Sequence, residues 1–270
     1  MRIVDQGPVR TFILERPHVR NAVDRETSER LRSAFLEFEG DDTVRIAVLW
    51  GEGGHFCAGA DLKELASLDL TLTHTGVEGP MGPTRLLLSK PVIAAVAGYC
   101  VAGGLELALW CDLRVAEENA VFGVFNRRWG VPLIDGGTVR LPRIVGMGRA
   151  LEMILTGRPV TASEALTWGL VNRVVPTGQA RAEAEKWAHQ IASFPPICLT
   201  HDRLSTYEQS ALSLADALRN EAYHGTFALI EEAGEGARNF AAGAGRHGIF
   251  ANSTSTGSSK EVTVNRNSGT

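Results

Sequence analysis

The feature that most constrains this chain is an apolar run that passes through a glycine-rich turn into a helix. Residues 91–97 are Pro-Val-Ile-Ala-Ala-Val-Ala, which predicts a strand, and the glycine-rich residues that begin at Gly98 predict a turn. A helix is predicted from Gly103 to Trp110. Backbone N–H groups at the start of a helix lack partners within it, so this turn is suited to binding negative charge. Glu106 lies just inside the helix, and a carboxylate beside an anion site suits chemistry next to a carbonyl group.

A second stretch of the chain has the same character. The apolar run from Ile46 to Trp50 predicts a strand, and it leads to the small residues Ala58, Gly59 and Ala60. Small residues allow a ligand to approach the backbone closely. The two turns could therefore each supply one backbone N–H group to a single oxyanion.

The two turns carry a resemblance to a known family. Residues 56–63, Phe-Cys-Ala-Gly-Ala-Asp-Leu-Lys, and residues 98–106, Gly-Tyr-Cys-Val-Ala-Gly-Gly-Leu-Glu, resemble the signature motifs of the crotonase superfamily, the enoyl-CoA hydratase/isomerase superfamily. Residues 14–22 resemble its N-terminal motif and residues 156–175 its later one. Four motifs in the family's order make the resemblance specific, and it runs from about residue 3 to about residue 250.

Strands that alternate with helices predict an α/β fold. Periodicity does not distinguish a doubly wound sheet from other α/β architectures, and the resemblance implies a crotonase-type superhelix of ββα units. It divides the chain into a core for CoA-thioester binding and catalysis (1–195) and a C-terminal helical region for oligomerisation (196–250). The family resemblance implies a homo-oligomer, either a trimer or a hexamer. Residues 251–270 are rich in Ser, Thr and Asn and are predicted to be disordered.

Several segments carry their own predictions. Asp24 is expected to cap an amphipathic helix that ends at Phe38, since apolar residues recur along it with helical spacing. A short helix is expected over 84–90. Long helices are expected over 204–220 and 221–232, and residues 65–83 are interpreted as a mobile surface segment beside the site.

The composition of the chain restricts the kinds of partner that the protein can bind and the cellular compartment in which it is expected. The net charge of −4 gives no basic footprint for nucleic acid, and no apolar run approaches the ~20 residues that span a bilayer. The N-terminus lacks the apolar region of a signal peptide. The four cysteines show no CxxC spacing, which predicts a reduced, cytoplasmic protein with buried thiols. None of the seven histidines has a spacing typical of metal ligands, so no metal is expected.

The resemblance implies catalytic roles for residues in both turns. The N–H groups of Ala58 and Gly103 would hold the thioester oxygen as it gains enolate charge, which is the work of an oxyanion hole. Glu106 would be the general acid/base. Such a group needs a pKa near neutrality, and partial burial would raise the pKa of a carboxyl group in that direction.

The chain departs from the family's pattern at one place. Hydratases of the family carry a second glutamate where this chain has Asn126, and an amide can orient a water but cannot give or take a proton. Asp135, in the loop over the predicted site, is the candidate for a second acid. The same aspartate could instead cap the helix that follows it.

Further residues match substrate-binding positions of the family. Arg16, Ala60 and Lys63 match contacts to the CoA nucleotide, and Asp61 belongs to the same binding segment by motif while also being a candidate helix cap. Phe125 and Trp129 would either line the acyl channel or belong to the core. The substrate-binding set implied by the resemblance is Arg16, Ala58, Gly59, Ala60, Asp61, Lys63, Gly103, Asn126 and Trp129.

The resemblance implies an acyl-CoA enzyme that stabilises a thioester enolate, with enoyl-CoA hydratase of fatty acid metabolism as the first candidate. Coenzyme A would enter as part of the substrate, and no other cofactor is expected. Because Asn126 replaces the second glutamate, isomerisation of the double bond and hydrolysis of a C–C or thioester bond stay open as alternatives. A non-catalytic acyl-CoA-binding oligomer is the alternative from another class.

Overall fold

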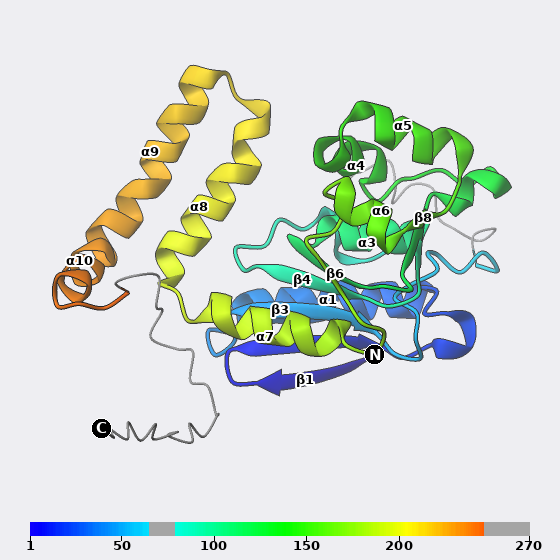
Figure 1. Ribbon diagram of the computed structural model, residues 1–270, viewed down its shortest axis with the longest axis horizontal. Coiled ribbons are helices and arrows are strands. Elements are labelled where there is room, and N and C mark those ends of the chain that lie inside the picture. Colours follow the sequence, from blue (N-terminus) through cyan, green and yellow to red (C-terminus); the bar gives the residue numbers. More distant parts are fainter. Residues whose placement is uncertain (65–78, 246–270) are drawn as a thin grey trace, which may run out of the picture.

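The computed structural model describes residues 1–64 and 79–245. Its centre is a sheet of six strands in the order β1-β2-β3-β4-β6-β9, in which β1 and β2 are antiparallel and the later neighbours are parallel (Figure 1). A smaller sheet has the order β5-β7-β8. The strands are β1 (Arg2–Gln6), β2 (Val9–Leu14), β3 (Ile46–Gly51), β4 (Val92–Val96), β5 (Tyr99–Val101), β6 (Leu113–Glu117), β7 (Val121–Gly123), β8 (Val160–Thr161) and β9 (Arg173–Val175).

Helices cover the sheet and extend beyond it. The helices with α geometry are α1 (Arg25–Gly40), α3 (Gly103–Trp110), α4 (Gly137–Val145), α5 (Met147–Thr156), α6 (Ala162–Thr167), α7 (Ala180–Ala192), α8 (Pro196–Glu208), α9 (Leu214–Glu231) and α10 (Ala233–Ala241). Short 3₁₀ turns are η1 (Pro17–Val19), η3 (Pro83–Arg85), η4 (Phe125–Trp129) and η5 (Gln209–Ala211). The described residues contain no helix long and apolar enough to cross a bilayer.

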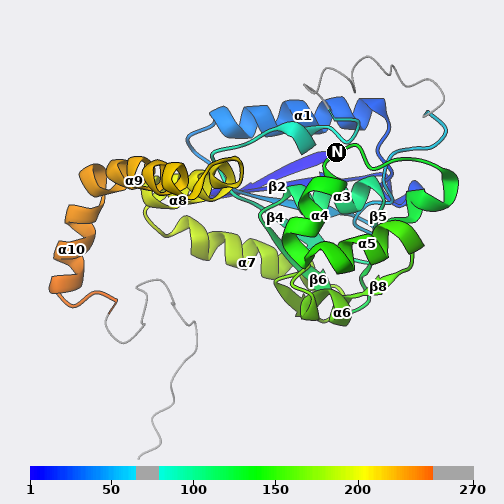
Figure 2. The same ribbon diagram turned by 90° about the horizontal axis from the view of Figure 1, so that it is seen from above.

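The sheet lies between two helical layers of different character (Figure 2). On one face, α1 buries Leu31, Ala34, Phe35 and Phe38, which are the residues that its apolar spacing singles out. Asp24 caps this helix by accepting a hydrogen bond from the Thr27 N–H at 2.8 Å, so the predicted cap is confirmed.

On the other face of the sheet, α7 packs through alanines four residues apart. Ala180, Ala184, Ala188 and Ala192 are all buried against apolar side chains of the central strands. A stripe of small side chains allows the helix axis to lie close to the sheet. The alternation of strands and helices predicted an α/β fold, and the two layers with their central sheet confirm it.

The ββα unit is visible where the chain passes from β4 to α3. β4 lies in the large sheet, and the chain turns at Gly98 (φ 48°) into β5 of the small sheet. α3 begins two residues after β5 and is buried along its whole length. The unit therefore places the first turn of α3, with Glu106, inside the molecule.

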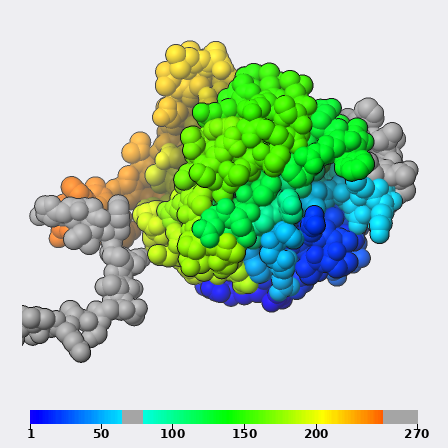
Figure 3. Space-filling view, turned by 45° about the vertical axis from the view of Figure 1, so that its right-hand side comes forward, coloured from blue at the N-terminus to red at the C-terminus, as the bar shows by residue number. Residues whose placement is uncertain are grey.

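The C-terminal helices α8, α9 and α10 stand out from the body of the molecule (Figures 1 and 3). The predicted bounds of 204–220 and 221–232 were wrong, because α8 ends at Glu208 and the break before α9 falls at 209–213. Ser213 sets the new start, since its hydroxyl accepts a hydrogen bond from the Asp216 N–H at 3.2 Å. Assembly of this region into a trimer or hexamer stays a prediction.

Another local prediction was wrong at residues 84–90, where only η3 is helical. Leu86 has an extended backbone, and its carbonyl accepts the indole N–H of Trp110 at 2.8 Å, so the chain leaves the helical path there. The expectations for the mobile segment and for the C-terminal tail fall mainly on residues 65–78 and 246–270, outside the described residues.

Candidate active site

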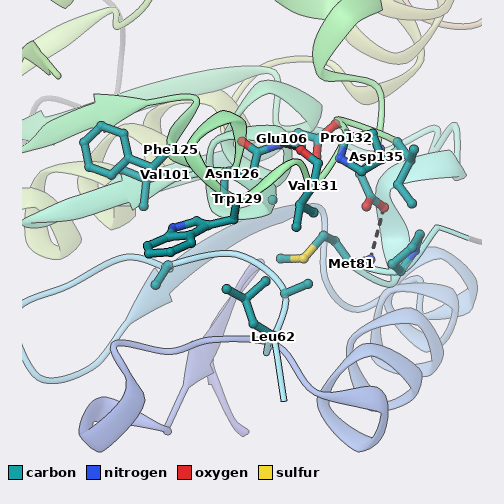
Figure 4. A pocket seen from close by; sticks show the side chains of 16 residues that line it. Leu62, Met81, Val101, Glu106, Phe125, Asn126, Trp129, Val131, Pro132 and Asp135 are labelled. Atoms are coloured by element: carbon teal, nitrogen blue, oxygen red, sulfur yellow. Dashed lines mark hydrogen bonds between the residues drawn. The ribbon is translucent and has the colours of Figure 1, made fainter. Parts of the chain in front are cut away.

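A cavity of about 220 Å³ lies where the two predicted turns meet, beside the first turn of α3 (Figure 4). Its wall is mostly apolar, as is typical of sites that bind small organic groups. Among the described lining residues, Glu106, Asn126 and Asp135 have polar side chains, and Trp129 adds the N–H group of its indole. The predicted site residues Ala58, Ala60, Gly103, Glu106, Asn126, Trp129 and Asp135 all line this cavity.

The N–H group of Ala58 is already used within the protein. It donates to the carbonyl oxygen of Arg20 at 3.0 Å, so it is not available to a ligand, and the prediction of Ala58 as an oxyanion donor needs correction. Within the described chain, the Ala60 N–H has no acceptor, and Ala60 lines the cavity. Of these two residues, it is therefore Ala60 whose N–H is left for a ligand in the cavity.

Gly103 is the first residue of α3, so its N–H is among those that have no partner within the helix. Gly59 brings the first turn against this helix end. A Cβ atom on Gly59 would lie 2.9 Å from the Gly103 nitrogen, and the φ of 98° at Gly59 also favours glycine. The absence of a side chain at Gly59 thus allows the N–H groups of Ala60 and Gly103 to lie near one another.

Glu106 is the central polar group of the cavity and is only 2% exposed. Its Oε1 atom accepts hydrogen bonds from the backbone N–H groups of Asp135 at 2.9 Å and Gly137 at 2.8 Å. A Cβ atom on Gly137 would lie 2.9 Å from this oxygen, so the glycine permits the close approach. The other oxygen, Oε2, accepts no hydrogen bond from the described residues. Because Glu106 lines the cavity, this oxygen is available to a bound ligand.

Burial, and to a smaller extent the negative charge of Asp135, together raise the pKa of Glu106 to about 7. The two backbone hydrogen bonds oppose this rise in part. A carboxyl group with a pKa near neutrality can both accept and donate a proton at physiological pH, which is the property that general acid/base catalysis requires.

Asp135 is also buried, at 3% exposure, but its contacts differ. Its Oδ1 atom accepts hydrogen bonds from the Met81 N–H at 3.0 Å, drawn as a dashed line in Figure 4, and from the Thr84 hydroxyl at 2.5 Å. Burial raises the pKa of Asp135 as well. The helix-cap alternative is wrong, because Gly136 occupies the cap position of α4. A role as second acid stays a prediction.

Asn126 lies in η4 and is 7% exposed. Its Nδ2 atom donates to the Val131 carbonyl at 2.8 Å, while its Oδ1 atom is buried without a hydrogen-bond partner in the described structure. A buried acceptor without a partner costs about 1–3 kcal/mol. Trp129 follows on the same 3₁₀ turn and is 73% exposed, so it lines the cavity from outside the core.

The residues matched to the CoA nucleotide lie outside the cavity wall, except Ala60. Arg16 is paired with two carboxylates, those of Asp24 at 2.9 Å and Asp61 at 3.3 Å. Lys63 is exposed. Asp61 accepts a hydrogen bond from the Lys63 N–H at 3.3 Å, and the residues after Glu64, where a capped helix would run, are outside the described range.

Sequence reasoning missed the residues that hold the loop over the site. Thr84 supports Asp135 directly, and Arg140 donates to the carbonyl oxygens of Asp135 at 2.9 Å and Thr84 at 2.6 Å. Thr84 lies more than fifty residues from both Asp135 and Arg140, so no local pattern could have indicated its contacts with them.

The fold and the meeting of the two turns beside Glu106 define a protein of the crotonase class. The chain belongs to the enoyl-CoA hydratase/isomerase family, whose model matches residues 6–252. The family resemblance and the crotonase-type fold predicted from the motifs are therefore confirmed.

Individual relatives are consistent with this assignment. The chain is 38% identical to the carnitinyl-CoA dehydratase of Proteus mirabilis over 201 residues, which is 74% of this chain and 77% of that one. It is 39% identical to the carnitinyl-CoA dehydratase of Salmonella typhi over the same length and coverage.

Solved structures show the same fold. An enoyl-CoA hydratase from Bacillus anthracis superposes with a TM-score of 0.82 at 32% identity, covering 89% of this chain and 95% of that one. An enoyl-CoA hydratase from Mycobacterium marinum gives a TM-score of 0.84 at 31% identity, with the same coverage.

Proposed function

We propose that this protein moves a proton at the carbon next to the carbonyl of an acyl-CoA thioester. The observation that carries the proposal is Glu106, which has one oxygen fixed by two backbone N–H groups and the other left for the cavity. Its pKa of about 7 suits a group that must take and return a proton in one turnover.

The N–H groups of Ala60 and Gly103 would hold the thioester oxygen. When a base removes the α-proton, negative charge moves onto this oxygen, and donors already in place stabilise it without reorganisation. One such donor contributes about 3 kcal/mol to lowering the barrier in enzymes where it has been removed. Both donors line the cavity together with Glu106, so the base and the anion site face one bound group.

The finer proposal is reversible hydration of a 2-enoyl-CoA to a 3-hydroxyacyl-CoA. Its support is the likeness to proteins named enoyl-CoA hydratase and carnitinyl-CoA dehydratase, which add or remove water. Isomerisation of the double bond is the second candidate, because it needs a single proton-carrying carboxylate and Asn126 cannot carry a proton. Hydrolysis of a C–C or thioester bond is less well supported, since Asp135 is the only candidate for a second proton carrier among the described residues that line the cavity.

The proposal extends to assembly and surroundings. Coenzyme A is proposed to enter as part of the substrate, without another cofactor, in a cytoplasmic homo-oligomer. The helices α9 and α10 expose Leu229, Ile230 and Phe240 by 71%, 72% and 65%, which suits contacts between subunits.

The test is turnover of crotonyl-CoA in deuterated water by the wild type and by Glu106→Gln. Gln keeps the acceptor for the two N–H groups but cannot carry a proton. Hydration with deuterium at the α-carbon, lost in the variant, supports the hydratase proposal. Exchange without hydration supports the isomerase candidate. A protein that binds the thioester but never exchanges the α-proton would be the non-catalytic acyl-CoA-binding oligomer.

A further inference from the structure

Arg140 is a half-buried cation beside the two buried carboxylates of the cavity. Its guanidinium donates to the carbonyl oxygens of Asp135 at 2.9 Å and Thr84 at 2.6 Å. No carboxylate in residues 1–64 and 79–245 forms an ion pair with it. Its positive charge is therefore not neutralised by direct contact with a carboxylate of the described chain.

The groups that face Arg140 leave two negative charges for it to balance. The titratable groups that act on it are Tyr207 from α8, Glu106 from α3, Asp135 from the loop and Cys111 from the end of α3. Burial raises the pKa of the Tyr207 hydroxyl and of the Cys111 thiol, so both are neutral at physiological pH. The carboxylates of Glu106 and Asp135 are the remaining partners of this charge.

The place of Arg140 in the sequence is unfavourable for its own helix. Its N–H donates to the Gly136 carbonyl at 2.8 Å, so it lies in the first turn of α4, where the helix dipole favours an acidic residue. The first turn of α4 has no acidic residue, and the Gly137 N–H at its start donates to Glu106 instead. The start of α4 and Arg140 thus both direct positive charge toward the same carboxylate.

Arg140 also completes the set of contacts that fix residue 135. The side chain of Asp135 is held by two other donors, and its N–H donates to Glu106 at 2.9 Å. The carbonyl oxygen is the remaining polar group of Asp135, and Arg140 binds it. A Cβ atom on Gly136 would collide with the guanidinium, so the glycine allows this contact.

We propose that Arg140 is a positioning residue for the proton carrier. It holds the Asp135 peptide so that the N–H of this peptide reaches Glu106, and its charge keeps Glu106 ionised beside Asp135. The inference rests on the proposed function, because it assigns the support of the same carboxylate.

The charge acts against the other influences on Glu106. Burial and the charge of Asp135 raise the pKa of Glu106, whereas the backbone hydrogen bonds from Gly137 and Asp135 and the charge of Arg140 lower it. Loss of the charge at residue 140 would raise this pKa further. More of Glu106 would then be protonated when it must accept the α-proton.

The test uses Arg140→Gln and Arg140→Lys, with α-proton exchange of butyryl-CoA in deuterated water as the readout. Gln removes the charge and keeps an N–H donor, whereas Lys keeps the charge and loses the planar fork of donors. Arg85→Gln is the matched control. Arg85 faces Asp135 and donates to the neighbouring Ile134 carbonyl at 2.9 Å, but it is exposed, so water and salt screen its charge.

We expect both Arg140 variants to lower the kcat of exchange about ten-fold, because the proton carrier is less well placed. KM should stay within a few-fold, since Arg140 is not part of the described cavity wall. In Arg140→Gln the acidic limb of kcat/KM should move to higher pH by about half a unit. The limb should stay in place in Arg140→Lys and in Arg85→Gln.

An unmoved limb in Arg140→Gln, or an equal shift in Arg140→Lys, would overturn the inference. If Arg140→Gln does not fold, Arg140→Lys decides alone. A lower kcat with an unmoved limb then supports the inference, and a limb displaced to higher pH overturns it.

The same assay separates this inference from the proposed function. A wild type without Glu106-dependent exchange would overturn the proposed function. A wild type whose exchange depends on Glu106, but whose acidic limb does not respond to Arg140→Gln, would overturn only the inference.

Discussion

The two buried carboxylates of the cavity, Glu106 and Asp135, have similar burial but opposite relations to their surroundings. The carboxylate of Glu106 is held in position by its surroundings, since the backbone N–H groups of residues 135 and 137 donate to one of its oxygens. The carboxylate of Asp135 instead holds other residues in position, since it joins Met81 and Thr84 to the loop that contains Asp135. The comparison teaches that burial alone does not identify a catalytic acid. Glu106 should be required for turnover and Asp135 for the position of the loop.

The comparison is tested most strongly by Glu106→Gln. Gln can accept the same two N–H hydrogen bonds but cannot transfer a proton, so we expect the turnover of crotonyl-CoA to fall by about 10³-fold. Steady-state kinetics measures the loss, and calorimetric binding of butyryl-CoA serves as the control for a formed site. A loss below ten-fold would contradict the role of Glu106.

A second test uses the pH dependence of stability. The pKa of Glu106 rises from 4.5 to about 7 on folding. The folded state therefore binds the proton more tightly, and the stability from this group is full below pH 4.5 and is lost as pH rises through 7. The shift corresponds to about 3 kcal/mol.

We expect Glu106→Gln to be more stable than the wild type by about 3 kcal/mol at pH 8, with the difference shrinking toward pH 5. Urea unfolding at the two pH values measures it. A difference that does not change with pH would show that the folded and unfolded pKa values of Glu106 are alike.

A third test removes the carboxylate that holds the loop. Asp135→Ala leaves the Met81 N–H and the Thr84 hydroxyl without their acceptor, which should lower the free energy of unfolding by about 2 kcal/mol. Thr84→Val removes one of the two donors and is the matched control, with an expected loss of about 1 kcal/mol. An Asp135→Ala variant as stable as the wild type would contradict the holding role.

The smallest effect is expected for Asp135→Asn, which keeps an acceptor for Met81 and Thr84 while removing the charge. Because that charge raises the pKa of Glu106, the acidic limb of kcat/KM should move to lower pH by less than about one unit. The rate at the plateau should change only a few-fold. A loss as large as that of Glu106→Gln would instead make Asp135 the second acid that the sequence suggested.

The sequence predicted the parts of the site that lie within one segment. The turn before α3 and the place of Glu106 follow from residues close together in the chain, and so does α1 with its cap at Asp24. Each of these depends on spacing and capping, which are local properties.

The parts that depend on contacts between segments were missed. Ala58 and Ala60 both belong to the first motif, and only the pairing of this segment with Arg20 decides which N–H group is used. Asp135 was expected to be a helix cap or an acid, because its partners Met81 and Thr84 lie more than fifty residues away. Hydrophobic periodicity does not predict contacts between residues so far apart in the chain.

The hydrogen bonds around Asp135 have a mechanical consequence. Met81 lines the cavity and donates to Asp135, and Asp135 donates through its own N–H to Glu106. A group bound against Met81 would therefore press on the same hydrogen-bonded chain that holds Oε1 of Glu106. The position of the Glu106 carboxylate would then depend on how well that group fits the cavity.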